Sequence, residues 1–202
     1  MKRLWIALLG AAVLSACHVP PVPDFTYYRL PRPQPLPVDA APLLQGALVV
    51  ELFGAGGIYG DQALIYALDP AAQEVRQYHY QLWTDSPPRV LQRRLIELLR
   101  DAGVAALVTD ELPVSAKAAR VRGAILRFDR VPTAGGGYQA VVGLHMRVDA
   151  ADGASLLDEY YRSEQPAAGD DLKTTVDAYG AALDEIFAKF HQDLRRKSPH
   201  AG

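Results

Sequence analysis

The sequence predicts an α+β domain of two layers, in which one mixed, mostly antiparallel sheet carries two main helices on one face. Several segments have the length and apolar pattern of strands, and two have apolar residues spaced three and four apart, as amphipathic helices do. Along the chain the order is strands, helix, strands, helix. A single sheet with both helices on one face is the simplest way to bury both apolar stripes.

Eight segments are interpreted as strands. The run 46–53 is nearly continuous apolar sequence, as in a central strand, whereas 138–149 alternates apolar and more polar residues, as a half-buried strand does. The glycines of 54–57 and of 134–137 each predict a hairpin turn. The predicted strands are 25–30, 46–53, 62–68, 74–83, 104–109, 120–130, 138–149 and 155–164.

Both predicted helices have recognisable ends. Ser86 is a candidate N-cap of the first helix, Pro87 suits its first position because an amide there would be unpaired, and Gly103 ends it. Asp170 or Asp171 caps the second helix. The apolar stripes are Val90, Leu91, Leu95, Leu98, Leu99 and Ala102 on the first helix, and Leu172, Val176, Tyr179, Leu183, Ile186, Phe187, Phe190 and Leu194 on the second.

Residues 1–17 have the pattern of a lipoprotein signal peptide with its lipobox. A short positive end precedes the apolar run 4–14, which at roughly 11 residues is too short to cross a bilayer but suits a signal peptide. Residues 14–17, Leu-Ser-Ala-Cys, resemble the lipobox that signal peptidase II recognises. The alternative is an ordinary signal peptide with a chance cysteine, or a buried helix.

The lipobox implies that Cys17 is diacylated, becomes the first residue after cleavage and is acylated again on its new amino group. Two or more acyl chains hold a protein stably on a membrane, whereas a single chain does so only marginally. His18 stands where enteric-type lipoproteins retained in the inner membrane have aspartate. By this resemblance the protein is lipid-anchored at the periplasmic face of the outer membrane.

Residues 18–42 contain eight prolines and are interpreted as a semi-rigid tether of about 3.1 Å per residue. Within this stretch, the β-favouring aromatics of 25–30 predict a short edge strand docked on the domain. The alternative is that this piece remains part of a disordered tether. A single α+β auxiliary domain then spans 43–197, and 198–202 form a tail.

Composition excludes several classes of function. Removal of the signal leaves 19 basic and 23 acidic residues, which provides no basic footprint for nucleic acid. A single cysteine rules out an intrachain disulfide and a cysteine-rich metal site. The histidines lack metal-ligand spacing, the 54–57 glycines lack the Gly-Lys-Ser/Thr ending of a phosphate loop, and no nucleophile elbow occurs. We therefore expect no enzymatic activity, no metal site and no cofactor.

Two groups of side chains are candidates for contact with a partner. Tyr27 and Tyr28 are assigned to a partner-binding surface, because tyrosine is enriched where one side is apolar and the other is wet. The arginines of the first helix either form a solvated face, which is the favoured interpretation, or bind lipid headgroups or an acidic partner. These arginines are Arg89, Arg93, Arg94 and Arg100.

Three short motifs carry a resemblance to a known family. They are Tyr27-Tyr28-Arg29-Leu30 soon after Cys17, Tyr59-Gly60-Asp61-Gln62 leading into Leu64-Ile65-Tyr66, and Tyr78-His79-Tyr80 with Trp83 before Pro87-Pro88. In this order, and over about residues 25–190, they resemble the ABC-type transport auxiliary lipoproteins, a group that includes the Pqi-type envelope lipoprotein.

The resemblance implies a non-catalytic periplasmic subunit of a transporter that moves lipids between two membranes. Its partners would be an MCE-domain protein and, through that protein, an ABC permease and ATPase. The alternative is an envelope assembly lipoprotein, such as a pilotin or an outer-membrane scaffold. A tethered hydrolase is a third hypothesis, and a homo-oligomer is left open.

The lipobox generates the first prediction. Cys17→Ala should abolish acyl labelling and processing by signal peptidase II, because the acylated sulfur is gone, and the uncleaved precursor should accumulate. Metabolic labelling with a fatty acid and gel migration measure both effects. Continued labelling of the variant would show that Cys17 is not the lipidation site.

Overall fold

The computed structural model describes residues 23–113 and 116–198. Cys17, the rest of the predicted signal peptide and residues 199–202 of the predicted tail lie outside this part of the chain. In the two described ranges, no helix is long and apolar enough to cross a membrane.

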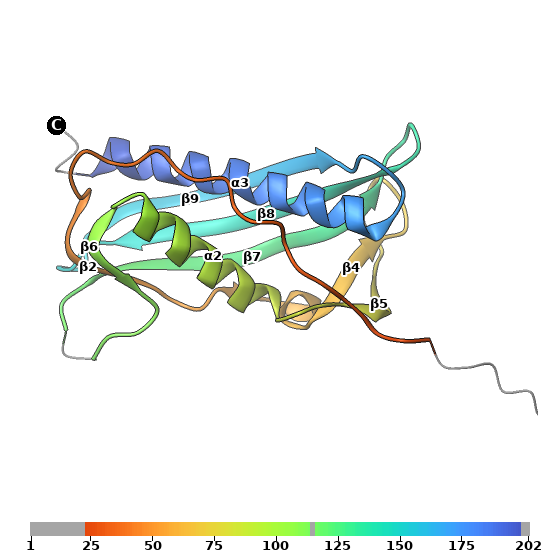
Figure 1. Cartoon of the computed structure of the whole chain (residues 1–202), viewed down its shortest axis with the longest axis horizontal. Coiled ribbons are helices and arrows are strands. Elements are labelled where there is room, and N and C mark those ends of the chain that lie inside the picture. The colour runs from red at the N-terminus through yellow and green to blue at the C-terminus, as the bar shows by residue number, and fades with distance from the viewer. Residues whose placement is uncertain (1–22, 114–115, 199–202) are drawn as a thin grey trace, which may run out of the picture.

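The strand β7 (Ala119–Pro132) is the centre of a nine-stranded mixed sheet (Figure 1). Along one edge it pairs antiparallel with β8 (Tyr138–Asp149), which pairs antiparallel with β9 (Ser155–Pro166). The opposite edge of β7 takes three shorter strands, all parallel to it and placed end to end. These are β2 (Leu44–Val50), β3 (Gly54–Ala55) and β4 (Ala63–Ala67).

The remaining strands extend the sheet at its margins. β5 (Val75–Trp83) pairs antiparallel with β4, and β1 (Thr26–Tyr28) pairs parallel with β5 as the terminal strand. β6 (Ala105–Thr109) pairs parallel with β2. The predicted edge strand near residue 27 is therefore present, and it docks on the domain.

The predicted hairpin turn at residues 54–57 is wrong. Gly54 and Ala55 form β3, and Gly57–Gly60 form the short 3-10 helix η1 before the chain reaches β4. A hairpin would pair β2 with β4, but both strands pair with β7, which is long enough to accept them one after the other. The glycines let the chain step along the edge of β7 rather than reverse.

Two helices cover one face of this sheet, as predicted: α2 (Pro87–Asp101) and α3 (Leu172–Lys197) (Figure 1). Leu95 and Phe187, which lie mid-stripe on the two helices, have no exposed surface. Both belong to one main core, which the helices share with the sheet. The α+β class and the two-layer arrangement are therefore confirmed.

The helix ends agree only in part with the expected caps. The Asp171 carboxylate caps α3 by accepting a hydrogen bond from the Thr174 amide at 2.7 Å, and this bond lowers the pKa of Asp171. Ser86 precedes α2 in an extended conformation, but its hydroxyl makes no capping hydrogen bond. Gly103 follows α2 with a φ of 73°, the left-handed conformation that glycine favours.

Residues 29–42, which we call the strap, cross the helical layer instead of forming a free spacer. Figure 1 shows this segment running over the helices before it enters β2. Leu36 is buried in the main core, and the Asp39 amide donates a hydrogen bond to the Ala102 carbonyl at the end of α2. The Asp39 carboxylate is buried with His191 of α3, at 2.7 Å.

The strap also fits closely against the middle of α3. A Cβ at Gly180 would lie 2.3 Å from the Cγ atom of Pro31, so the strap can approach this helix only because residue 180 is glycine. The Gln34 amide donates to the Asp184 carboxylate at 3.2 Å. The sequence-based boundary at residue 43 thus falls too late, because prolines make a segment extended but do not prevent it from packing.

The core generates the second prediction. Leu95→Ala and Phe187→Ala should each lower the free energy of unfolding by about 2–5 kcal/mol, because each leaves a cavity in a packed interior. Urea denaturation measures the change. Leu126→Ala is a suitable control, since that side chain is 47% exposed, and its effect should stay within about 0.5 kcal/mol. Similar losses at Leu95 and Leu126 would contradict the core described above.

Candidate functional site

A cavity of about 410 Å³ opens between the start of the strap and α2. Its apolar lining comes from three separate segments of the chain. Tyr28 ends β1 and Leu30 belongs to the strap, Trp83 ends β5, and Val90 lies in the first turns of α2. Pairing of β1 with β5 creates this arrangement, because it places Tyr28 opposite Trp83.

Arginine is the dominant charged residue around this opening, which we call the arginine cavity. Arg29 and Arg32 come from the strap, whereas Arg93 and Arg94 come from α2. Glu97 is the one acidic residue among the lining side chains. The four arginines differ sharply in how their charge is balanced.

Arg94 is a buried structural residue. Its side chain is 5% exposed, its Nη1 donates to the Pro31 carbonyl at 2.6 Å, and its Nη2 donates to Asp184 of α3 at 2.7 Å. A buried charge is tolerated when it is paired in this way. The Nε of Arg94 is also buried and has no hydrogen-bond partner in the structure. Arg94 thereby links α2, α3 and the strap.

The other arginines of α2 are held at the surface by nearby acceptors. The Asp85 carboxylate lies 2.7 Å from Arg93 and 3.6 Å from Arg89. Arg100 donates to the Val108 carbonyl at 2.9 Å. The expectation of one solvated row is therefore wrong for Arg94, because the strap and α3 cover that side of the helix.

Arg29 and Arg32 of the strap differ from the four arginines of α2. Both side chains belong to exposed residues, and neither has an ion pair or a hydrogen bond within residues 23–113 and 116–198. Two uncompensated guanidinium groups thus stand beside an opening with an aromatic lining.

The two tyrosines assigned to partner contact lie on opposite sides of β1, since side chains alternate along a strand. Tyr28 packs against the main core and lines the arginine cavity. Tyr27 is 57% exposed and lies on the same side as Phe25, which is 56% exposed. Phe25 contacts Tyr80 with ring centroids 5.6 Å apart. We call Phe25, Tyr27 and Tyr80 the Tyr27 patch.

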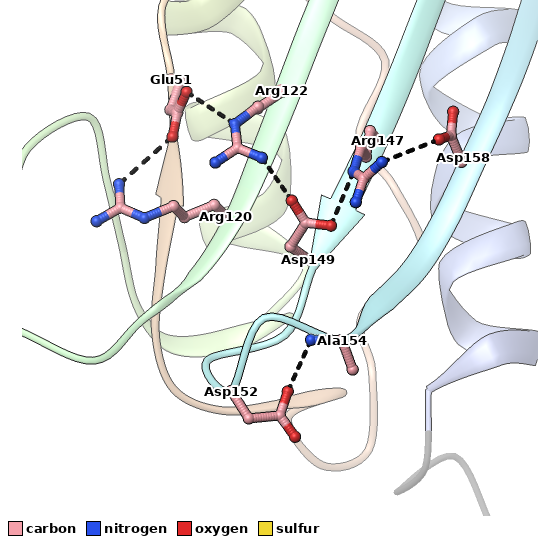
Figure 2. A network of polar contacts seen from close by, with 8 residues as sticks. All are labelled: Glu51, Arg120, Arg122, Arg147, Asp149, Asp152, Ala154 and Asp158. Carbon is pink, nitrogen blue, oxygen red and sulfur yellow. Dashed lines mark hydrogen bonds and ion pairs between the residues drawn. The ribbon is translucent and has the colours of Figure 1, made fainter.

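The sheet face opposite the helices carries a series of ion pairs, which we call the ladder, and its charged side chains are paired with one another (Figure 2). Arg122 contacts both Glu51, at 3.2 Å, and Asp149, at 2.5 Å. Arg147 continues the series between Asp149, at 2.8 Å, and Asp158, at 3.4 Å. Acidic and basic groups alternate across neighbouring strands, so the ladder neutralises itself and leaves little net charge for a ligand.

Side chains suited to acid–base chemistry are used for packing. Tyr59 donates to Asp129 at 2.8 Å, and Tyr161 donates to Asp193 at 3.0 Å. Burial, and then the neighbouring carboxylate, raise the pKa of both phenols well above the ordinary value. Both tyrosines therefore stay protonated and act as hydrogen-bond donors. Among the described residues, no group of three potential metal ligands occurs.

Comparison with known families identifies the chain. The family model of the ABC-type transport auxiliary lipoprotein component matches residues 28–189. The chain belongs to this family. As an ABC-type transport auxiliary lipoprotein, it is an auxiliary component of a transport system in the cell envelope. The match begins at Tyr28 and so includes the strap, in agreement with its packing on the domain. No curated protein sequence matches the chain significantly.

Solved structures resemble this auxiliary lipoprotein in fold. A protein from Xanthomonas campestris, assigned to the DUF330 family, has a TM-score of 0.69 at 18% identity and covers 82% of this chain and 92% of its own. An uncharacterized protein has a TM-score of 0.67 at 13% identity, with 85% and 99% covered. A hypothetical protein from Chlamydia trachomatis has a TM-score of 0.53 at 8% identity, with 77% and 98% covered. At these identities the likeness concerns the fold alone.

The arginine cavity was missed in the sequence although several of its residues were singled out there. Tyr28, Arg29, Leu30 and Trp83 all belong to the motifs that carry the family resemblance, and all line the opening. The local signal was the density of arginine at 29 and 32 directly after an aromatic strand. What the sequence did not indicate is that the strap turns back onto α2.

Arg94 generates the third prediction. Arg94→Lys keeps the charge but loses the planar fork that reaches Pro31 and Asp184 together, so the free energy of unfolding should fall by about 1–3 kcal/mol. Chemical denaturation gives this value. Arg93→Lys is the matched control one position away, and its loss should stay below about 1 kcal/mol because that pair is exposed. Equal losses in both variants would show that Arg94 has no special structural role.

Proposed function

We propose that the protein is a lipid-anchored, non-catalytic subunit of an MCE/ABC-type system that transports lipids between membranes. The family match over residues 28–189 is the observation that carries this proposal, since it makes the chain an auxiliary transport component. The lipobox at Cys17 supplies the anchor, and His18 favours the periplasmic face of the outer membrane. The uses found for Tyr59, Tyr161 and their carboxylates are structural, which agrees with a subunit that has no chemistry of its own.

Docking to an MCE-domain protein would use the Tyr27 patch, with Tyr28 beneath it as its support. Exposed aromatic side chains are enriched at interfaces, where a few of them supply most of the affinity. β1 is also the terminal strand of the sheet, so its outer backbone edge is available for hydrogen bonds with a partner. The ABC permease and ATPase would be reached through the MCE-domain protein.

Co-purification from membranes tests this proposal and gives the fourth prediction. The tagged wild-type lipoprotein should bring down an MCE-domain protein, and Tyr27→Ala should weaken that complex about tenfold or more because an exposed anchor is lost. Tyr160→Ala is the matched control, since Tyr160 is 71% exposed on β9. This control should leave the complex unchanged.

Stability measurements separate the roles of the two adjacent tyrosines. Tyr27→Ala should unfold at the same urea concentration as the wild type, whereas Tyr28→Ala should be less stable because it packs on the core. If wild-type protein brings down neither an MCE-domain protein nor a permease, the transport proposal fails. If Tyr160→Ala weakens the complex and Tyr27→Ala does not, the docking surface lies around Tyr160 on β9 instead.

A further inference from the structure

The docking of β1 and Phe25 fixes how far the folded domain can move from its predicted lipid anchor. A tether that lasted to residue 42 would reach about 80 Å at 3.1 Å per residue. Instead, the chain joins the domain at Phe25 and Thr26, which contact Tyr80 and pair with Gln81. Phe25 lies eight positions after Cys17 in the sequence, and eight residue steps span at most about 29 Å.

The arginine cavity lies directly after this attachment point. Its first lining residue is Tyr28, three positions beyond Phe25, and the unpaired Arg29 and Arg32 follow at once. An acylated Cys17 would therefore hold these two guanidinium groups within a short distance of the headgroups in which it is anchored. No comparable cluster of unpaired arginines occurs on the ladder face in Figure 2, where each drawn arginine meets a carboxylate.

We infer that the arginine cavity binds the phosphate group of an anionic phospholipid in the membrane that carries the anchor. Guanidinium groups bind phosphate through paired N–H donors, and they are more weakly hydrated than ammonium groups. Tyr28 and Trp83 give the opening the aromatic lining that suits the boundary between headgroups and acyl chains. The inference rests on the lipid anchor of the proposed function, but not on the MCE partner.

Size and position favour a headgroup over a segment of an acidic protein. A volume of about 410 Å³ suits one headgroup with its glycerol, whereas a protein interface would need a larger surface. The Tyr27 patch lies on the other side of β1, so lipid contact at the cavity and partner contact at the patch can occur together. The domain would then be oriented on the membrane rather than suspended above it.

Trp83 provides a built-in reporter for the experiment. The chain has two tryptophans, and the other one, Trp5, lies in the predicted signal peptide, so the mature protein has Trp83 alone. Acylated mature protein is reconstituted into vesicles of phosphatidylcholine with or without phosphatidylglycerol, each containing phosphatidylcholine spin-labelled on the headgroup. Because the anchor holds the protein on both kinds of vesicle, quenching of Trp83 reports contact at the cavity rather than membrane attachment.

Quenching of Trp83 should be stronger in vesicles with phosphatidylglycerol and should weaken as salt is added. The double variant Arg29→Gln/Arg32→Gln should weaken this association about 25-fold, since each arginine near an anionic surface contributes about fivefold. The matched control is Arg76→Gln/Arg162→Gln, which removes two charges from side chains that are 58% and 56% exposed. The control should quench like the wild type.

Three results would overturn the inference. One is equal quenching on neutral and anionic vesicles, or in the double variant and the wild type. A second is a change in Trp83 emission of detergent-solubilised protein with inorganic phosphate alone that matches the vesicle response, which would assign the cavity to a soluble phosphate compound. A third is a matching response to soluble oligoglutamate, which would assign it to an acidic protein segment. Failed co-purification of an MCE-domain protein would leave the inference standing.

Discussion

The buried guanidinium of Arg94 joins three parts of the molecule that are far apart in the sequence. Its two terminal nitrogens bind the strap at Pro31 and α3 at Asp184, while its backbone belongs to α2. The strap can follow this path because Gly180 leaves space for Pro31 and because Leu36 enters the core. This link holds the strap against α2, where the two segments together line the arginine cavity.

The proline-rich strap is a packed part of the domain rather than a free tether. A segment with many prolines loses little entropy when it is fixed, since its backbone is restricted before folding. Its attachment through Asp39 to His191 and to the end of α2 therefore costs less than it would for a flexible chain. If Cys17 is lipidated as proposed, only the short piece before Phe25 would connect the domain to its anchor, and β1 would lie near the membrane.

Whether an arginine of this protein carries an unbalanced charge depends on its partner in the fold, and not on the net charge of the chain. The formal net charge is −2, and most arginines meet a carboxylate within the fold, as on the ladder face. Arg29 and Arg32 stand out because neither has a carboxylate partner among the described residues, and Glu97 is the one acidic residue that lines their cavity. A weakly acidic protein can thus present a small positive site close to its predicted anchor without being a basic protein.

The sequence by itself determined the α+β class, the two helices with their buried stripes, the Asp171 cap and the edge strand near Tyr27. Periodicity and capping are local, and local patterns survive whatever the chain does elsewhere. The sequence also carried the family resemblance, since the motifs around Tyr28, Tyr59 and Trp83 are short and follow one another in the order typical of the family. Only the tertiary structure decided that β2, β3 and β4 share one edge of β7, that Arg94 is buried, and that the strap closes the arginine cavity. Each of these features depends on which distant segments come into contact. Whether a side chain is buried or its charge is paired depends on residues that are far away in the sequence, and neighbouring residues do not determine it.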